Sequence, residues 1–311
     1  MNTNSIYKSQ GYDLYKNLLI FTEDNIEAVA KGNKLSLFEI YDIADHIIND
    51  FERSAALMDV AVNFYDPDDV VVSHAVNNTI FSLKMALEMD LSEEDIQDTV
   101  TAALVHDVGF GKIKESLRDK EQDLSIITEK EHELVQTHPK HGYDAIAPET
   151  ERDKRIAETI LQHHERADGS GYPNGLEESQ QQISARIISI VDVYEALIHP
   201  RPFRDALVPP KGIEVLVKQK GSEFSVEMLK ALIVSLSFYP IGQMVLLNNG
   251  FIGKVIRTHK DNPTRPDVQL YIDPSGNKLE EQEIIRLEEK RILSIEKCLP
   301  GFKSDTSNFK E

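Results

Sequence analysis

Apolar residues recur along most of the chain with the spacing of an amphipathic helix. From about residue 10 to 64 they lie three or four positions apart, most clearly in LFEIYDIADHIINDF, with Asn33 or Ser36 as a candidate N-cap. Pro67 interrupts this pattern, and a further helix is predicted through HAVNNTIFSLKMALEM. The pattern therefore predicts a helical N-terminal segment, residues 1–64, in front of a larger helical body.

Four more helices are predicted in the middle of the chain. LSEEDIQDTVTAALVHDVG begins with Ser92 as N-cap and has Asp95 three positions later, a carboxylate form of the capping box. A helix over about 129–146 is expected to end before Pro148, and ERDKRIAETILQHHE is amphipathic. ISARIISIVDVYEALI is apolar on almost every face, which places it in the core.

The pattern changes after Pro240. Two short runs rich in β-branched residues flank the Asn-Gly pair in QMVLLNNGFIGKVIRT, and DVQLYID alternates as a strand does. We expect a small antiparallel β appendage at about 241–275 and, beyond it, a charged tail that is helical or frayed. The predicted fold class is mainly α: a helical bundle over 65–240, with the appendage and tail of 241–311 packed on it.

Composition excludes several classes of protein. A net charge of −19 argues against binding to a nucleic-acid polymer, although a local group of cations or metal ions still suits a small anionic ligand. No apolar run reaches the 18 residues that a membrane span requires, and the first residues lack the features of a signal peptide. The lone Cys298 fits a reducing compartment. We therefore expect a cytoplasmic protein without a membrane anchor.

Histidines and aspartates supply the candidate chemistry. A single histidine in a helix is more often hydrogen-bonded or solvated than a metal ligand. Asp192, however, lies inside the most apolar helix, where an unpaired carboxylate costs several kcal/mol, so it should be paired, protonated or bound to metal. Five of the ten histidines and one further aspartate lie where such a site would use them: His74, His106, Asp107, His138, His163 and His164.

A mixed set of nitrogen and oxygen ligands suits iron, manganese, zinc or nickel better than magnesium. The two oxygens of one Asp carboxylate are able to bridge two ions. Two ions about 3.5–4 Å apart polarise a phosphodiester and deprotonate a bridging water. The chemistry that this set of residues favours is hydrolysis.

Several motifs resemble those of the HD-GYP family, a branch of the HD phosphohydrolase superfamily that cleaves the bacterial messenger cyclic di-GMP. The matching stretches are HD at 106–107, HP at 138–139, HHERADGSGYPNGL at 163–176 and DVYEAL at 192–197. The resemblance implies an HD-domain helical bundle and two divalent metal ions, iron or manganese before zinc or nickel. It implies Asp107 as the bridging, catalytic carboxylate and the following metal ligands: His74, His106, Asp107, His138, His163, His164 and Asp192.

The resemblance also implies a loop that faces the substrate, here called the GYP loop, made of Glu165, Arg166, Asp168, Gly169, Gly171, Tyr172 and Pro173. Its charged residues are read either as shaping the loop or as an ordinary surface helix end. Tyr172 is expected to contact substrate or to pack the loop down. In HPRPFRDAL, Arg201 and Arg204 are expected to bind substrate phosphates, the alternative being solvated arginines.

Two positions depart from the family pattern. The family usually reads HD-x-G-K, whereas this chain reads HDVGFGK, with Phe110 at the lysine position and Lys112 two residues later. Lys112 is therefore a candidate catalytic and substrate-binding residue if the loop brings it in; otherwise the phosphate loses a cationic partner. Val70 stands where members with three metals carry a glutamate one turn before His74. Two metals are therefore expected rather than three.

The function expected from these motifs is a metal-dependent phosphodiesterase that hydrolyses cyclic di-GMP to linear pGpG, with GMP as an open second product. One alternative is a weak or inactive metal-bearing receptor or scaffold, which binds cyclic di-GMP or GGDEF-type cyclases and other signalling proteins through the GYP loop. Another is an HD phosphohydrolase for a different cyclic dinucleotide. Residues 1–64 are read as a regulatory region, as a dimerising pair of helices in a homodimer, or as a cap on the bundle.

Overall fold

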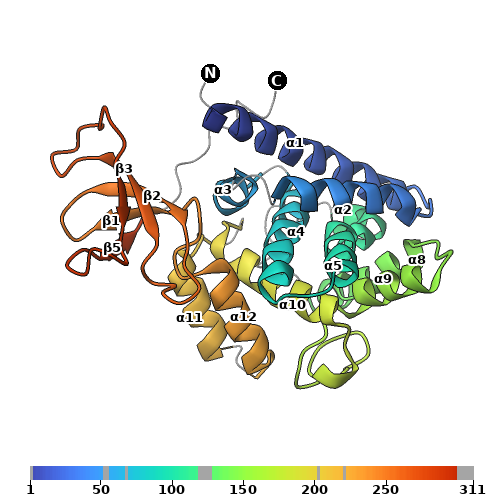
Figure 1. The fold of residues 1–311 in the computed structure, drawn as a ribbon. Helices are drawn as coiled ribbons and strands as arrows, with labels where there is room; N and C mark the ends of the chain where they lie inside the picture. The colour runs from blue at the N-terminus through green and yellow to red at the C-terminus, as the bar shows by residue number, and fades with distance from the viewer. Residues whose placement is uncertain are drawn as a thin grey trace.

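The computed structural model describes residues 3–51, 56–66, 69–117, 128–201, 204–219 and 222–299. A helical body makes up most of the molecule, and a small β-sheet lies at one end of it, beside α11 and α12 (Figure 1). The predicted fold class, mainly α with a small antiparallel sheet near the C-terminus, is confirmed. No helix in the described part of the chain is long and apolar enough to cross a membrane.

Helices account for residues up to Leu236. In chain order they are α1 (Thr3–Ala30), α2 (Leu37–Phe51), α3 (Ala56–Asn63), α4 (Val70–Glu88), α5 (Glu93–Val105), the 3-10 turn η1 (Val108–Lys112), α6 (Lys114–Leu117), α7 (Glu129–Val135), α8 (His138–Ala145), α9 (Glu151–Gln162), the 3-10 turn η4 (Glu178–Gln180), α10 (Ile183–Ile198), α11 (Pro209–Gln219) and α12 (Val226–Leu236).

Local signals explain where several of these helices begin. Ser92 caps α5 by accepting a hydrogen bond from the Asp95 N–H, as predicted. The single helix expected over 129–146 is wrong, because it is divided into α7 and α8. Thr128 closes a capping box at the start of α7, whereas Pro139 lies in the first turn of α8, where its missing N–H costs nothing.

One continuous hydrophobic core joins the helices. Residues of α4 and α10 are buried along most of both helices, which cross at the centre of the body. The N-terminal helix α1 contributes Tyr15, Leu18, Ile26 and Val29 to the same core. The described residues of this N-terminal region, 11–51 and 56–64, therefore pack as part of the helical body.

The β-sheet has five antiparallel strands in the order β4-β3-β2-β1-β5. They are β1 (Met244–Leu247), β2 (Ile252–Arg257), β3 (Asp267–Ile272), β4 (Ile284–Arg286) and β5 (Ile295–Cys298). Over residues 276–299 the expected helical or frayed tail is wrong, since β4 and β5 lie there; the rest of the predicted tail lies outside the described residues. Ile285 and Cys298 are buried in a separate core under the sheet, which supplies the burial that makes these short charged segments extended.

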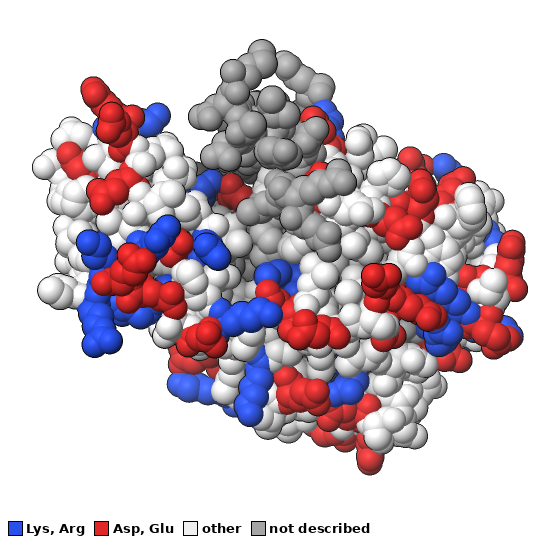
Figure 2. Space-filling view, in the orientation of Figure 1, with Lys and Arg blue, Asp and Glu red and all other residues white. Residues whose placement is uncertain are grey.

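The sheet is held against the body by ion pairs as well as by packing. Lys254 Nζ in β2 lies 2.7 Å from Asp59 Oδ2 in α3, and Lys260 Nζ lies 2.5 Å from Glu88 Oε2 at the end of α4. On the face drawn in Figure 2, Lys and Arg side chains are interspersed with Asp and Glu over both the sheet and the body.

Candidate metal centre

Three histidines at helix ends share one orienting contact. His106 follows α5, His163 follows α9, and His138 is the first residue of α8, with two residues between it and the end of α7. In each, ring atom Nδ1 donates to the backbone carbonyl three residues earlier: 2.7 Å to Ala103, 2.7 Å to Val135 and 2.6 Å to Ile160. Because a carbonyl only accepts, Nδ1 carries the proton in all three rings, and Nε2 is the atom presented to the centre.

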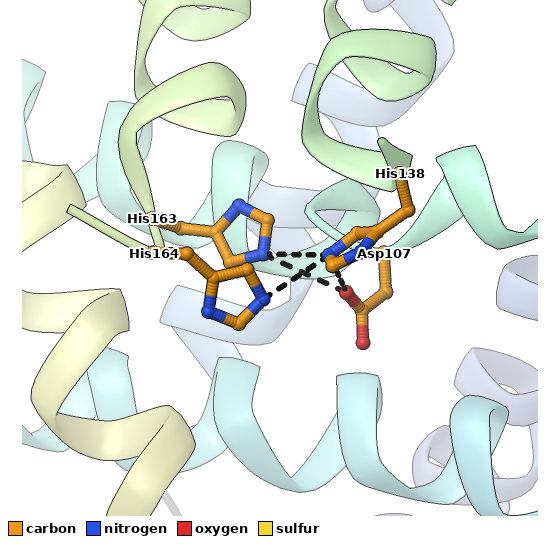
Figure 3. A group of neighbouring side chains, drawn as sticks. All are labelled: Asp107, His138, His163 and His164. Atoms are coloured by element: carbon orange, nitrogen blue, oxygen red, sulfur yellow. Dashed lines mark hydrogen bonds and ion pairs between the residues drawn. The ribbon is translucent and has the colours of Figure 1, made fainter. Parts of the chain in front are cut away.

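Asp107 lies between two groups of these rings. Its Oδ1 is 3.2 Å from Nε2 of His138 and 3.7 Å from Nε2 of His163. Its Oδ2 is 3.4 Å from Nε2 of His106 and 3.9 Å from Nε2 of His74. Each oxygen therefore faces a different pair of imidazoles, which is the arrangement that a bridging carboxylate requires. Figure 3 shows one group converging on Asp107.

The remaining predicted ligands close the two groups. His164 Nε2 lies 3.2 Å from His138 Nε2, and His164 Nδ1 lies 3.8 Å from Asp192 Oδ2. Asp192 Oδ1 in turn lies 2.8 Å from His74 Nε2. The possible ligand atoms form two compact sets that share one carboxylate: Asp107, His138, His163 and His164 in the first, and His74, His106 and Asp107 in the second.

The nitrogens of this centre fit divalent cations. His138 Nε2 lies 3.2 Å from His163 Nε2, and in both rings the neutral form leaves that atom with a bare lone pair. The Nε2 atom of His106 is fully buried and makes no hydrogen bond within the described part of the chain. Converging lone pairs and an orphaned buried acceptor are costly unless a proton or a metal ion lies among them. The negative ends of α5 and α9 also favour a cation here.

Burial and local charges set the protonation states of the centre. Burial lowers the pKa of His106 to about 4 and that of His164 well below its ordinary value. Burial alone would raise the pKa of Asp107, but the neighbouring rings of His106, His138 and His163 hold it well below the usual range. At neutral pH the site therefore presents an ionised bridging carboxylate beside the neutral imidazoles of His106 and His164, the forms that bind metal.

The pKa of His74 is shifted in the opposite direction from those of His106 and His164. Burial alone would lower the pKa of His74, but Glu195 and the hydrogen bond to Asp192 outweigh it and raise the pKa to about 10. Asp192 is likewise held below its ordinary pKa against the effect of burial, chiefly by the hydrogen bond from His74. A metal ion at this side of the centre must therefore displace a proton from His74.

Glu195 was not identified from the sequence. It lies one turn after Asp192 in α10, is 1% exposed, and its Oε2 accepts a hydrogen bond from Nδ1 of His74. The signal was present, because the argument made for Asp192 applies equally to a second carboxylate in the same apolar helix.

The GYP loop is closed by its own polar contacts. The carboxylate of Glu165 is buried and accepts from the backbone N–H groups of Asn174 at 2.7 Å and Leu176 at 2.9 Å. Arg166 lies with Nε 3.3 Å from Glu223 Oε2. Asp168 Oδ1 accepts from the Ser170 N–H at 3.0 Å, a local turn in the loop. These contacts are those expected of residues that shape the loop.

The tip of the GYP loop lies on the metal centre. The Tyr172 ring stacks on the ring of His164 at a centroid separation of 4.8 Å, and the following bond to Pro173 is cis. Gly169 has a φ of +74°. A Cβ on Gly171 would lie 2.4 Å from the carbonyl oxygen of His164, so only glycine permits this approach. Tyr172 is thus placed both to pack the loop and to line the site.

Two predicted cations lie apart from the cluster. Lys112 is exposed, and its Nζ lies 3.6 Å from the position of a Cβ on Gly32, beyond the end of α1. Arg204 donates to the backbone carbonyls of Ala196 and Leu197 at the end of α10. Arg201, in contrast, reaches the centre, with Nη2 3.1 Å from His74 Nδ1.

The departures from the family pattern have defined places. Phe110 stacks on His138 at a centroid separation of 4.3 Å. Asp69 caps α4 through its Oδ1, which lies 3.1 Å from the Val72 N–H, and Val70 is the first residue of that helix. The turn before His74 therefore adds no ligand to the two sets above.

A family model described as an HD domain matches residues 66–227, just over half of the chain. The chain belongs to the HD domain family. A second model, described as a KOW domain associated with HD domain, matches residues 244–302, which contain all five strands. The HD domain match covers all seven of the predicted ligands, and the KOW match accounts for the strands that were missed after residue 275.

Curated relatives carry the resemblance further. The HD domain chain is 25% identical over 256 residues to a cyclic di-GMP phosphodiesterase of Pseudomonas aeruginosa, covering 82% of this chain and 61% of that one. It is 29% identical over 212 residues to the cyclic di-GMP phosphodiesterase PdeB of Borreliella burgdorferi, covering 68% and 55%. It is also 30% identical over 162 residues to a 3′3′-cGAMP-specific phosphodiesterase of Vibrio cholerae, covering 52% and 30%.

These relatives confirm the predicted resemblance. This chain spans only 61% and 55% of the length of the first two. Among solved structures, an HD-GYP-type protein of Bdellovibrio bacteriovorus aligns with a TM-score of 0.53 at 18% identity, covering 69% of each chain. That likeness concerns the fold, which is the HD domain bundle expected from the motifs.

Proposed function

We propose that this protein is a metal-dependent phosphodiesterase that hydrolyses cyclic di-GMP. The observation that carries the proposal is Asp107, whose two oxygens face two separate sets of inward-pointing imidazole nitrogens. The names of the relatives described above support cyclic di-GMP as the substrate. A dinuclear centre of this kind suits phosphodiester hydrolysis, because it acts at both the attacking and the leaving oxygen.

The proposal assigns one metal ion to each set of ligands. His138, His163 and His164 would hold the first ion with Asp107 Oδ1, and His74, His106 and Asp192 would hold the second with Asp107 Oδ2. Bound there, two divalent ions supply an activated water and polarise the phosphoryl oxygens. The family resemblance puts iron or manganese before zinc or nickel, and the mixture of imidazole and carboxylate ligands accepts all four.

The protein residues at the rim would orient the substrate. Tyr172 lies over His164 and offers an aromatic face to a guanine base. Arg201 lies beside His74, where its guanidinium is suited to a phosphate oxygen. Arg204 and Lys112 are left out of the proposal, because their described contacts are with helix carbonyls and with the region of Gly32.

Turnover by the full chain tests this function. Protein loaded with Mn²⁺, or with Fe²⁺ under anaerobic conditions, is expected to convert cyclic di-GMP to pGpG, and an Asp107→Asn variant is the matched inactive control. Cyclic di-GMP binding without hydrolysis in metal-loaded protein would support the scaffold instead. Faster hydrolysis of 3′3′-cGAMP in a competition assay would support the other cyclic dinucleotide.

A further inference from the structure

The carboxylate of Glu195 lies behind His74, on the side of that ring away from Asp107, and contacts four side chains. Its Oε2 contacts Nδ1 of His74 and lies 2.9 Å from Nη2 of Arg201. Its Oε1 lies 2.8 Å from Nδ1 of His199 and 3.3 Å from Nδ2 of Asn77. A single buried carboxylate therefore contacts both the metal ligand His74 and the arginine assigned to the substrate phosphate.

The contact with Glu195 orients the ring of His74. The carboxylate accepts a hydrogen bond from Nδ1 of His74, which directs Nε2 of that ring toward Asp107 and Asp192. Carboxylates in this position behind a ligating histidine fix the ring and make it a stronger ligand.

The contacts continue from Glu195 to the N-terminal helix. Asn77 in α4 is fully buried and accepts on Oδ1 a 2.7 Å hydrogen bond from the hydroxyl of Tyr15 in α1. Its Nδ2 donates to the Phe64 carbonyl at 3.2 Å as well as to Glu195. Tyr15 is itself fully buried, with its ring packed edge-on against Phe64 at 5.2 Å. All four residues of the path Tyr15–Asn77–Glu195–His74 are buried.

Helix α1 also lies on the turn that carries the bridging aspartate. Gly111 is in η1, which begins directly after Asp107. A Cβ on Gly111 would lie 2.3 Å from the carbonyl oxygen of Ile26 and 2.9 Å from the nitrogen of Ala30, so the two backbones are in direct contact. This contact is independent of the hydrogen bonds through Tyr15, and it places α1 behind both halves of the centre.

We propose that α1 is a working part of the metal centre, in which Tyr15, Asn77 and Glu195 form a buried relay that positions His74 and Arg201. Glu195 is the positioning residue, and Tyr15 fixes it from the N-terminal helix. The inference rests on the proposed function only in taking His74 as a metal ligand. It assigns to residues 1–64 a role in metal binding, in place of a separate module.

Mn²⁺ titration of the full chain, followed by electron paramagnetic resonance, tests the relay. Wild type is expected to bind two equivalents and to show the spectrum of an exchange-coupled pair. Glu195→Gln should weaken one equivalent roughly 10- to 100-fold. Tyr15→Phe, which keeps the ring and removes only the hydroxyl, should weaken that same equivalent by roughly 2- to 10-fold.

Tyr41→Phe is the matched control. It also removes a tyrosine hydroxyl, whose 2.8 Å hydrogen bond goes to Asp153 at the start of α9, at the opposite end of that helix from His163. Its Mn²⁺ affinities should equal those of wild type. The increase in melting temperature on adding Mn²⁺ should be smaller in Tyr15→Phe than in Tyr41→Phe.

Two results would overturn the relay. One is unchanged affinity for both equivalents in Glu195→Gln and Tyr15→Phe. The other is a melting temperature of Tyr15→Phe that falls equally with and without Mn²⁺, which is the mark of a purely structural hydroxyl. Should Glu195→Gln not fold, Tyr15→Phe alone decides. Because metal binding is read directly, an absence of cyclic di-GMP turnover would reject the proposed function and leave this test intact.

Discussion

The rings of Phe110 and His138 lie 4.3 Å apart and within 21° of parallel, so an uncharged aromatic side chain covers one metal-ligand candidate. In the pattern that this chain resembles, that position is a lysine. Phe110→Lys should return a cation to the phosphate and raise kcat/KM for cyclic di-GMP by roughly 10-fold or more. Steady-state kinetics at saturating Mn²⁺ measures it. Phe110→Leu, which is uncharged, should give no increase; an equal increase in both variants would contradict the electrostatic explanation.

Asp107→Asn should disrupt the dinuclear centre. The amide keeps the shape of the side chain but loses the charge and one of the two acceptor oxygens that face the imidazole pairs. We expect loss of one metal equivalent and a fall in turnover of roughly 1000-fold, as when a group that stabilises the transition state is removed. Elemental analysis and product assay give the two readouts. Two tightly bound ions in Asp107→Asn would rule out the bridging role.

The stability of the metal-free protein should be greatest near pH 6.5. The pKa of His106 is lowered to about 4 in the folded protein, so between pH 6.5 and 4 the unfolded chain binds the extra proton and stability falls as pH falls. The pKa of His74 is raised to about 10, so above pH 6.5 the folded protein holds the extra proton and stability falls as pH rises. Thermal unfolding in EDTA from pH 4.5 to 8.5 measures both slopes.

Metal ions should change the alkaline side of that profile. Binding requires neutral His74, so the proton it holds competes with metal less as pH rises. The increase in melting temperature caused by Mn²⁺ should therefore be larger at pH 8.5 than at pH 6.5. If the increase in melting temperature caused by Mn²⁺ were smaller at pH 8.5 than at pH 6.5, metal binding would not require His74 to lose its proton.

Gly171→Ala should impair the GYP loop without unfolding the body. The added Cβ would lie 2.4 Å from the His164 carbonyl oxygen and 2.5 Å from the Arg166 nitrogen, so the loop must move away from the metal centre. We expect KM for cyclic di-GMP to rise roughly 10-fold or more, with little change in metal content. Gly276→Ala is the control: its φ of +88° means that alanine strains a turn of the β appendage, but no atom lies within 4 Å of the added Cβ. Equal kinetics in the two variants would exclude a substrate-facing role for the loop tip.

Predictions from the sequence were best where chemistry depends on local spacing. His163 and His164 are adjacent, and His106 and Asp107 are adjacent, so their approximate placement follows from the ends of two helices. Lys112 illustrates the opposite case, because the direction of its side chain depends on how η1 packs against α1. That contact lies about eighty residues away along the chain and leaves no local pattern.

The missed elements have a similar cause. β4 and β5 consist of short apolar pairs among many charges, and only Ile285 and Cys298 are buried in them. Their strand conformation comes from pairing with β3 and β1, partners about fifteen and fifty residues away. For Glu195 the apolar helix indicated a paired carboxylate, but the identity of its partner, His74, more than a hundred residues earlier, had no local signal.

The bonds from Nδ1 of His106, His138 and His163 to carbonyls three residues earlier have a consequence for how this centre is able to vary. Because each bond is made within a few residues of its histidine, it orients the imidazole independently of the length of chain that joins one helix to the next. Insertions or deletions between these helices should therefore be tolerated. Moving any one of the histidines by a single position would turn its ring away from the other two.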